Sequence, residues 1–564
     1  MNPTTVTPGP GADWWKDVVV YQIYPRSFCD SNGDGIGDLN GITSKLDYLK
    51  ALGVDVLWLS PHFDSPNADN GYDIRDYRKV MAEFGTMDDF DRLVREASAR
   101  GLKIILDLVV NHTSDEHGWF QESLKSKDNP YRDWYIWRDG RDGGPPNNYT
   151  AFFGGSAWKL DPATGQYYLH YFAEKQPDLN WETPAVRAEV CDTMRFWLDK
   201  GVAGFRMDVI PFISKRPGLP DLTAEQLSHP ELVYADGPRV HEFLQEMHRE
   251  VLGPYDAVSV GEAFGVTFDQ SLLFTDARRR ELSMIFHFDL VRLDRDGWRK
   301  TQWTLPQVKA VYSRIDAAAG EHGWNTSFLG NHDNPRAVSH FGNDTPRWRD
   351  LSAKALATVL LTQRATPFIY QGDELGMTNY PFQGLEDFDD VEVRGLWALL
   401  VTTGKVSAQE FLGHLRQNSR DHARTPVQWS SGPNAGFTTG KPWLAVNPNY
   451  SDINAADQLD DPDSVFHYHR RLLALRRGNR ALVHGAYHDL APDHDRVLAF
   501  TRALGDSRWL IVVLFGEQPC EFALPEGLSI GEAVLDNGAG PTAGPGDTVL
   551  HLAPWQAVVY KISG

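Results

Sequence analysis

The sequence predicts an α/β fold, a (β/α)8 TIM barrel with an inserted domain and a C-terminal antiparallel β domain. The first observation is a series of short runs rich in β-branched and aromatic residues, which is typical of buried strands. The second is the helical pattern that separates these runs, since strands alternating with helices favour a parallel sheet. The third is a change to closely spaced β runs after Arg480.

Four strands are expected in the first part of the barrel, at 18–24, 54–61, 102–112 and 202–210. The first of them, VVVYQIY, ends at a proline, and the other three are runs of Val, Ile, Leu and Phe. Helices are expected between them at 42–53, 87–100 and 184–200. In the first helix Ile42, Leu46, Leu49 and Leu52 share one face, as a helix that packs on a sheet requires.

Four more strands are expected at 257–264, 284–290, 325–333 and 366–374, which complete a set of eight. The stretch 111–182 is too long for one crossover and is rich in Trp, Tyr, Gly, Pro and Asn, so it predicts an inserted domain. The runs at 496–504, 508–515, 520–525 and 557–563 predict the C-terminal β domain. The expected domains are 1–110 and 183–480 for the barrel, 111–182 for the insert and 481–564 for a C-terminal β-sandwich.

Composition limits the classes of partner. The 564 residues carry a formal charge of −21, which disfavours nucleic acid as a partner. The sequence contains no run of about 18 apolar residues, so no membrane span is expected. Three separated cysteines, Cys29, Cys191 and Cys520, indicate a reducing compartment, and the N-terminal residues show no secretion signal. We therefore expect a cytoplasmic protein that is a monomer or a weak homo-oligomer.

Titratable side chains gather at the carboxyl ends of four predicted strands, where barrels place their active sites. The groups are Asn111, His112, Arg206, Asp208, Glu262, His332 and Asp333. Three carboxyl groups suit glycoside chemistry, in which one carboxylate attacks and a second, protonated, donates to the leaving oxygen.

Two of the three acids can be given roles from their neighbours. Arg206 lies two residues before Asp208 on the same strand face and can keep it ionised, which favours Asp208 as the nucleophile. Glu262 has apolar neighbours, Ala263 and Phe264, that can raise its pKa and favour it as the general acid. A lone buried acid is more often structural, but this combination favours catalysis.

Four ordered motifs resemble those of the α-amylase superfamily, glycoside hydrolase family 13. They are DLVVNH (107–112), GFRMDVI (204–210), GEAF (261–264) and FLGNHD (328–333). Three further segments narrow the resemblance to the oligo-1,6-glucosidase group, which includes dextran glucosidases and sucrose isomerases: DNGYDI (69–74), QPDLN (176–180) and ARTPVQW (423–429). The resemblance implies a retaining double displacement on a small oligosaccharide or disaccharide, without an organic cofactor.

By matched position, the resemblance implies Asp208 as nucleophile, Glu262 as acid/base and Asp333 as stabiliser of the transition state. The implied substrate-binding residues are Asp69, Tyr72, His112, Phe172, Gln176, Arg206, Val209, His332 and Arg424. Tyr72 would stack on the first sugar, and Asp69 with Arg424 would close the pocket around a non-reducing terminal glucose. The alternative for these last two is an ordinary surface ion pair.

The segment DSNGDGIGD (30–38) places side-chain oxygens at regular intervals. The first six positions fit an EF-hand loop, but Gly41 stands at the twelfth and a strand precedes the loop. The resemblance implies instead one structural cation, usually calcium. Its ligands would be Asp30, Asn32, Asp34, Asp38 and the carbonyl oxygen of Ile36. The alternative is a solvated turn of Asp, Asn and Gly residues.

Two features bear on the reaction catalysed. Val209 follows the nucleophile, and relatives that cleave α-1,6 bonds tend to have Val there. The segment RLDRD (292–296) resembles isomaltulose synthases, in which it affects the product. We expect mainly a hydrolase of α-1,6-glucosides and related short sugars, with a sucrose isomerase as the alternative. A catalytically inactive, transporter-associated protein is disfavoured because all three acids are present.

Overall fold

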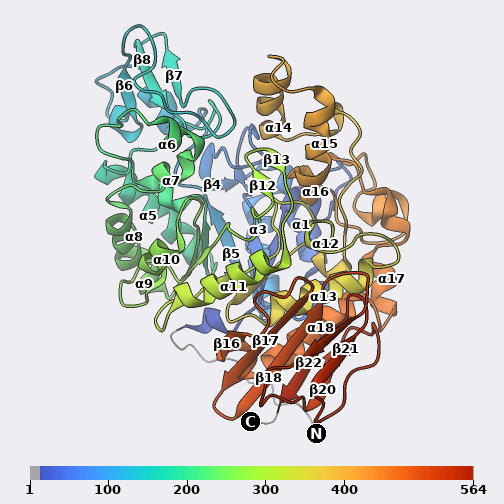
Figure 1. The fold of residues 1–564 in the computed structure, drawn as a ribbon. Helices are drawn as coiled ribbons and strands as arrows, with labels where there is room; N and C mark the ends of the chain where they lie inside the picture. Colours follow the sequence, from blue (N-terminus) through green and yellow to red (C-terminus); the bar gives the residue numbers. More distant parts are fainter. Residues whose placement is uncertain (1–12, 563–564) are drawn as a thin grey trace.

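The computed structural model describes residues 13–562, and its centre is a ring of eight parallel strands (Figure 1). The strands are β1 (Val20–Ile23), β2 (Val56–Leu59), β5 (Lys103–Leu108), β9 (Gly204–Met207), β10 (Val258–Glu262), β11 (Met284–Phe286), β14 (Thr326–Ser327) and β15 (Thr366–Tyr370). Each lies inside one of the eight predicted ranges, so the predicted (β/α)8 barrel is confirmed.

The sheet has the order β11-β10-β9-β5-β2-β1-β15-β14. Its two ends meet where the Thr326 hydroxyl donates a hydrogen bond to the Ile285 carbonyl over 2.9 Å. Buried side chains such as Trp58, Phe286 and Phe368 pack against one another inside the ring. The interior is therefore a packed core, and the substrate site has to lie above it, at the strand ends.

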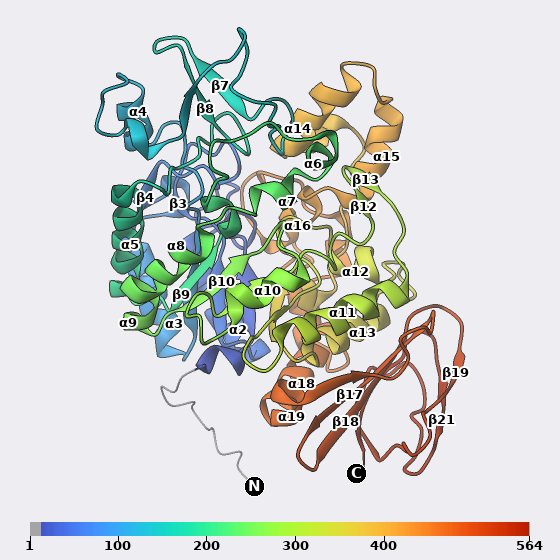
Figure 2. The same ribbon diagram turned by 60° about the vertical axis from the view of Figure 1, so that its left-hand side comes forward.

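Helices surround the barrel, as the second view shows (Figure 2). They include α1 (Leu39–Ser44), α2 (Leu46–Leu52), α3 (Met87–Ala99), α5 (Pro184–Asp199), α8 (Val240–Met247), α10 (Phe268–Thr275), α11 (Leu305–Ala319), α13 (Arg349–Leu361), α18 (Val465–Arg477) and α19 (Arg480–His484). The helix expected at 42–53 is two helices, because Lys45 leaves the helical region with φ −105° and ψ 5°. The helices expected at 87–100 and 184–200 are α3 and α5.

Two structures rise above the carboxyl ends of the strands (Figure 1). The inserted segment forms α4 (Gly118–Ser123) and an antiparallel sheet of β6 (Trp137–Asp139), β8 (Gln166–Leu169) and β7 (Trp158–Asp161). Opposite it stands a helical hairpin, which we define as residues 391–418: α14 (Val391–Leu396), the π-helix η9 (Trp397–Val401) and α15 (Ala408–Asn418). The hairpin packs on Phe382 and Phe388 and was not predicted from the sequence.

The C-terminal part is the predicted antiparallel β domain. Its larger sheet contains β16 (Ala486–Asp489), β17 (Val497–Leu504), β18 (Ser507–Leu514), β22 (Ala557–Ile562) and β20 (Glu532–Asp536), and its smaller sheet contains β19 (Cys520–Ala523) and β21 (Val549–Leu552). The larger sheet docks through buried cations. Arg502 donates to the carbonyls of Leu482 and Val483, and Lys309 of α11 donates to those of His494 and Val497.

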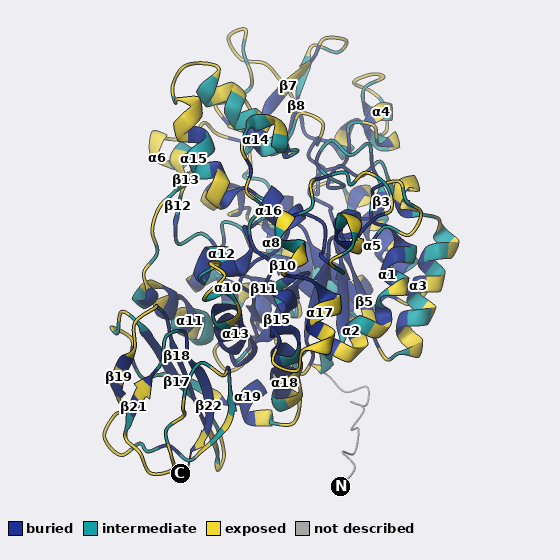
Figure 3. Cartoon of the chain, turned by 90° about the vertical axis from the view of Figure 1, so that its right-hand side faces the viewer, coloured by how far each residue is buried: buried dark blue, intermediate teal, exposed yellow. Residues whose placement is uncertain are grey.

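Burial follows this architecture, since the buried residues lie in the barrel and between the C-terminal sheet and the barrel helices on which it packs (Figure 3). None of the helices within 13–562 is long and apolar enough to cross a membrane. Residues 1–12, which showed no secretion signal in the sequence, lie outside the described residues. So does the last residue of the predicted strand 557–563. The exact domain boundaries stay a prediction.

Candidate active site

Three neighbouring regions of the barrel rim supply the predicted acids. Asp208 follows β9 directly, Glu262 is the last residue of β10, and Asp333 lies in the loop after β14. The side chains of Asp208 and Glu262 are buried, whereas that of Asp333 is 27% exposed. Strands β9 and β10 can approach closely because Gly204 has no side chain, and a Cβ there would lie 2.0 Å from the Val258 carbonyl oxygen.

Arg206 joins the acids into one charged group. Its Nη1 donates to Asp208 Oδ1 over 2.7 Å and to Asp107 Oδ1 over 2.8 Å, while its Nη2 donates to Glu262 Oε2. All four side chains are buried, so the charges act across a medium of low polarity. Arg206 was predicted as a partner of Asp208, and the structure also brings it to Glu262 and to Asp107.

Burial has the largest effect on the pKa values of Asp208 and Glu262. It raises the pKa of Asp208 to about 7 and that of Glu262 to about 8, while the positive charge of Arg206 offsets part of both shifts. Two close carboxyl groups with raised pKa values hold one proton between them near neutral pH. The pair can then provide one ionised carboxylate and one protonated acid, as a glycosidase needs.

Val209 has an unusual backbone. Its φ of 35° and ψ of 40° place a β-branched residue in the left-handed region, which costs on the order of 1–3 kcal/mol. In this conformation its amide donates to Glu262 Oε2 over 3.1 Å. The strained residue therefore links the end of β9 to the candidate acid on β10.

Tyr72 and His332 lie against the acidic side chains of the site, Tyr72 beside Asp107 and His332 beside Asp333. Their rings stack with centroids 5.2 Å apart, and the Tyr72 hydroxyl lies 2.6 Å from His332 Nε2 and donates to Asp107 Oδ2 over 3.0 Å. Burial lowers the pKa of His332 to about 3, so the imidazole is neutral. A neutral imidazole beside an aromatic ring can hydrogen-bond a sugar hydroxyl without adding charge.

His112 and Gln176 adjoin Tyr72, since His112 Nε2 lies 3.1 Å from the Tyr72 carbonyl oxygen and Gln176 Nε2 donates to that oxygen over 3.3 Å. Gln176 Nε2 donates to Asp69 Oδ2 over 3.0 Å and lies 3.3 Å from His112 Nε2. The ring of Phe172 lies 5.2 Å from that of His112. Burial lowers the pKa of His112 to about 4, so it too is neutral. The structure thus brings together five predicted residues, Asp69, Tyr72, His112, Phe172 and Gln176.

Arg424 and Asp333 meet directly, since Arg424 Nη2 lies 2.9 Å from Asp333 Oδ1. Burial alone would raise the pKa of Asp333, but the positive charges of Arg420 and Arg424 outweigh it and help to hold that pKa well below its usual range. The cation that pairs with Asp69 is Arg420, at 3.8 Å. Burial raises the pKa of Asp69 to about 7. The predicted direct pair of Asp69 and Arg424 is thus not present among the ion pairs of residues 13–562: Asp69 pairs with Arg420, and Arg424 pairs with Asp333.

Sequence reasoning missed three residues of the site. Arg420 lies four residues before Arg424, a spacing that places both on one helical face and could have revealed it. Asp107 stands alone among the apolar residues of β5, which is a signal of a buried polar contact. Asp390, which accepts two hydrogen bonds from Arg420, gave no signal because it lies in a loop before the helical hairpin.

The predicted metal ligands lie in the loop between β1 and α1. The Asp30 carboxylate accepts from the amides of Gly33 and Gly35, and Asn32 and Asp34 each accept an amide two residues onward. The oxygen donors suit a hard cation such as calcium. However, Asp38 caps α1 through Gly41 and also binds Ser31, and no group of three or more Asp, Glu, His or Cys residues within 13–562 is placed to hold a metal.

A barrel that carries a carboxyl pair and a third acid beside neutral histidines defines a carboxylate-based glycoside hydrolase. Residues 22–485 match the model of the alpha-amylase catalytic domain, and the chain belongs to this family. The resemblance seen in the sequence is thereby confirmed.

Similar proteins are known at high identity. The oligo-1,6-glucosidase of Parageobacillus thermoglucosidasius is 51% identical over 97% of this chain and 99% of that protein. The oligo-1,6-glucosidase of Bacillus cereus is 48% identical over 97% of this chain and 99% of that protein. Among solved structures, an isomaltulose synthase variant from Erwinia rhapontici NX5 in complex with sucrose has a TM-score of 0.97, 56% identity and coverage of 98% and 99%. The trehalulose synthase of Pseudomonas mesoacidophila MX-45 has a TM-score of 0.97, 56% identity and coverage of 98% and 100%.

Proposed function

We propose that the protein is a retaining, exo-acting α-glucosidase that hydrolyses terminal α-1,6-linked glucosides and related short sugars. The observation that carries the proposal is the buried pair of Asp208 and Glu262, bridged by Arg206. The ionised Asp208 attacks the anomeric carbon while Glu262 gives its proton to the leaving oxygen, which forms a covalent glucosyl-enzyme. Glu262 then takes a proton from water, which attacks the same carbon and releases Asp208.

The surrounding residues support an exo mode of action. In the proposal Tyr72 stacks on the terminal glucose, and the neutral His112 and His332 hydrogen-bond its hydroxyls. Asp333, held ionised by the two arginines, stabilises the positive charge of the oxocarbenium-like transition state. The curated relatives named oligo-1,6-glucosidase and the valine at position 209 support the α-1,6 preference.

A sucrose isomerase is the second candidate. It is favoured by the structural neighbours that are isomaltulose and trehalulose synthases, and by Arg292, whose guanidinium carbon lies 5.0 Å from the ring centroid of Phe264 near Glu262. Both reactions share the glucosyl-enzyme. They differ in whether water or a retained fructose attacks it.

Product analysis separates the two candidates. The purified protein is incubated separately with isomaltose, isomaltulose, maltose and sucrose, and all products are resolved by chromatography. Free glucose from the 1,6-linked sugars, formed faster than from maltose, supports the α-1,6-glucosidase. Isomaltulose or trehalulose accumulating from sucrose with little free glucose refutes hydrolysis as the main activity.

We also propose that the loop 30–38 binds one structural calcium ion away from the catalytic acids. The ligands would be the side chains of Asp30, Asn32, Asp34 and Asp38 with the Ile36 carbonyl, and the support is the hard oxygen chemistry of this set. Added calcium should then raise the unfolding temperature of chelator-treated protein, and an Asp30→Ala, Asp34→Ala double variant should not respond. An equal response of both proteins would contradict the assignment.

The remaining finer expectations are proposals as well. We propose that the protein works in the cytoplasm on free small saccharides, as a monomer or weak homo-oligomer, with neither nucleic acid nor membrane as a partner. The net charge of −21 and three free, buried cysteines support this. We propose domain boundaries at 110/111, 182/183 and 480/481. Size-exclusion chromatography with light scattering tests the oligomeric state.

A further inference from the structure

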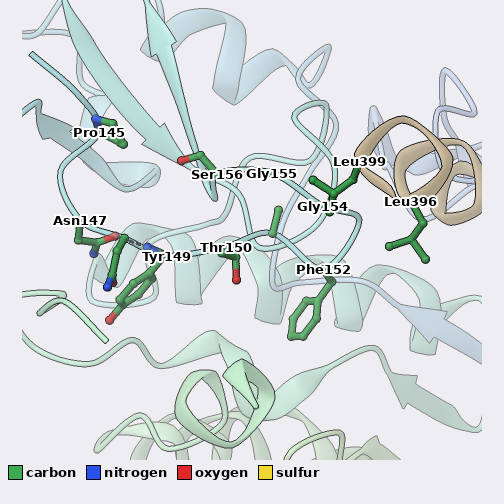
Figure 4. Close-up of a pocket in the computed structure, with 12 residues that line it drawn as sticks. Pro145, Asn147, Tyr149, Thr150, Phe152, Gly154, Gly155, Ser156, Leu396 and Leu399 are labelled. Atoms are coloured by element: carbon green, nitrogen blue, oxygen red, sulfur yellow. Dashed lines mark hydrogen bonds between the residues drawn. The ribbon is translucent and has the colours of Figure 1, made fainter. Parts of the chain in front are cut away.

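The inserted segment and the helical hairpin meet above the catalytic pocket. A Cβ added to Gly395 of α14 would lie 2.3 Å from the carbonyl oxygen of Phe153, and one added to Gly154 would lie 3.4 Å from Leu399 Cδ2. Figure 4 shows Gly154 beside Leu396 and Leu399. The helix can therefore reach the loop backbone only because residue 395 has no side chain.

This backbone contact lies directly outside the catalytic site. The guanidinium carbon of Arg420 is 5.3 Å from the ring centroid of Phe153, and the ring of Phe172 is 5.8 Å away. Arg420 in turn lies 3.3 Å from Asp333. The position of the Phe153 backbone thus sets where its ring stands over the pocket rim.

The preceding residue holds the loop to the other side of the site. The ring of Phe152 stacks on Phe212 at 5.6 Å and lies 5.5 Å from Phe264, two residues after Glu262. Phe152 and Phe153 therefore cover two sides of the rim from one short loop.

A hollow lies between the loop and the helical hairpin. The hollow has a volume of about 550 Å³ and is lined by residues of the 145–156 stretch and by Leu396 and Leu399 (Figure 4). Gly154 and Gly155 have φ values of 98° and 84°, and a Cβ on Gly155 would meet no heavy atom within 4 Å. A side chain at position 395 would therefore have to shift the Phe153 backbone away from the helix.

We propose that Gly395 is a specificity-determining position, which lets the helical hairpin hold Phe153 over Arg420 and so restricts the pocket to short α-glucosides. The inference rests on the proposed function, because it concerns which α-glucosides that site accepts. Gly395 acts through Phe153 and is a positioning residue.

The test compares Gly395→Ala with Gly413→Ala. Both glycines lie in helices of the same hairpin, but a Cβ on Gly413 would meet no heavy atom within 4 Å. Gly395 has no positive φ, so alanine strains no backbone there and acts through the contact with Phe153. The readouts are kcat and KM for isomaltose and for isomaltotriose to isomaltohexaose, with unfolding temperature as a check of the fold.

We expect Gly395→Ala to lower kcat/KM for isomaltose by about 10-fold, mainly through KM, because the rim group is displaced by about 1 Å. The ratio of kcat/KM for isomaltohexaose to that for isomaltose should rise by a similar factor. Gly413→Ala should leave both values within about two-fold of the unchanged protein, since distant sites do not couple.

A second variant keeps the inference testable if Gly395→Ala folds poorly. Phe153→Ala keeps the backbone carbonyl but removes the ring, so it should raise the same substrate ratio. Combining it with Gly395→Ala should add little further. An unchanged ratio in both single variants, or fully additive effects, would overturn the inference while leaving the proposed function standing. Cleavage of no α-glucoside by the unchanged protein would overturn both.

Discussion

Replacing Arg420 by methionine should reveal how the charges beside the pocket are balanced. Arg420 donates to Asp390 Oδ2 over 2.8 Å and lies 3.3 Å from Asp333, 3.5 Å from Glu392 and 3.8 Å from Asp69. Burial raises the pKa of Asp69 to about 7, so it is only partly ionised near neutral pH. Arg420 and Arg424 therefore mainly balance Asp333 and Asp390.

The expected cost follows from the burial of Asp390, which is 1% exposed. Without Arg420 its nearest cation is Arg424, at 3.8 Å. Removing one partner of a buried ion pair costs about 3–5 kcal/mol, because the other charge is left uncompensated. We expect Arg420→Met to lower the free energy of unfolding by this amount, measured by urea denaturation with tryptophan fluorescence.

A second substitution separates stability from activity. Adding Asp390→Asn removes the orphaned charge and should restore about half of the lost free energy, in line with the smaller cost of a neutral buried group. Activity on isomaltose should be low in both the single and the double variant, because Phe153 loses the guanidinium beside its ring and Asp333 loses one of its two arginine partners. A loss below about 1 kcal/mol in Arg420→Met, or no recovery in the double variant, would refute this account of the cluster.

Three further predictions concern the reaction itself. Asp208→Asn should lower turnover by about 10⁴-fold or more while the unfolding temperature is kept, and substantial remaining turnover would rule out Asp208 as the nucleophile. The pH profile of kcat/KM for isomaltose should be bell-shaped, because activity is lost as the pH falls through about 7 and Asp208 gains a proton, and as it rises through about 8 and Glu262 loses one. A flat profile across this range would contradict the shared proton. Val209→Thr should change the ratio of kcat/KM for isomaltose to that for maltose by about 5–150-fold, which corresponds to about 1–3 kcal/mol. An unchanged ratio would mean that this side chain does not read the linkage.

Strand positions and strand-end residues were predictable because both follow from local rules. Buried parallel strands need β-branched and aromatic runs, and a barrel brings their carboxyl ends to one rim, so Asp208 and Glu262 could be placed together without coordinates. The helical hairpin could not be foreseen, because it packs on its own small core outside the barrel alternation. The link from Arg420 to Asp69 joins residues 351 positions apart, and no local pattern encodes such a contact.

The way the C-terminal sheet docks has a consequence for how such genes can recombine. Lys309 of the barrel is fully buried and donates hydrogen bonds to the backbone carbonyls of residues 494 and 497. In the other direction, Arg502 of the sheet donates to the carbonyls of Leu482 and Val483 near the end of α19. A crossover between relatives near residue 480 would separate Lys309 from its acceptors at 494 and 497, unless both parents present the same backbone there, whereas Arg502 would stay with Leu482 and Val483. The terminal sheet is thus inherited with its barrel, and shortened genes that stop before it should encode chains that aggregate, because the barrel side chains that pack against Leu498, Phe500 and Ile511 would be exposed.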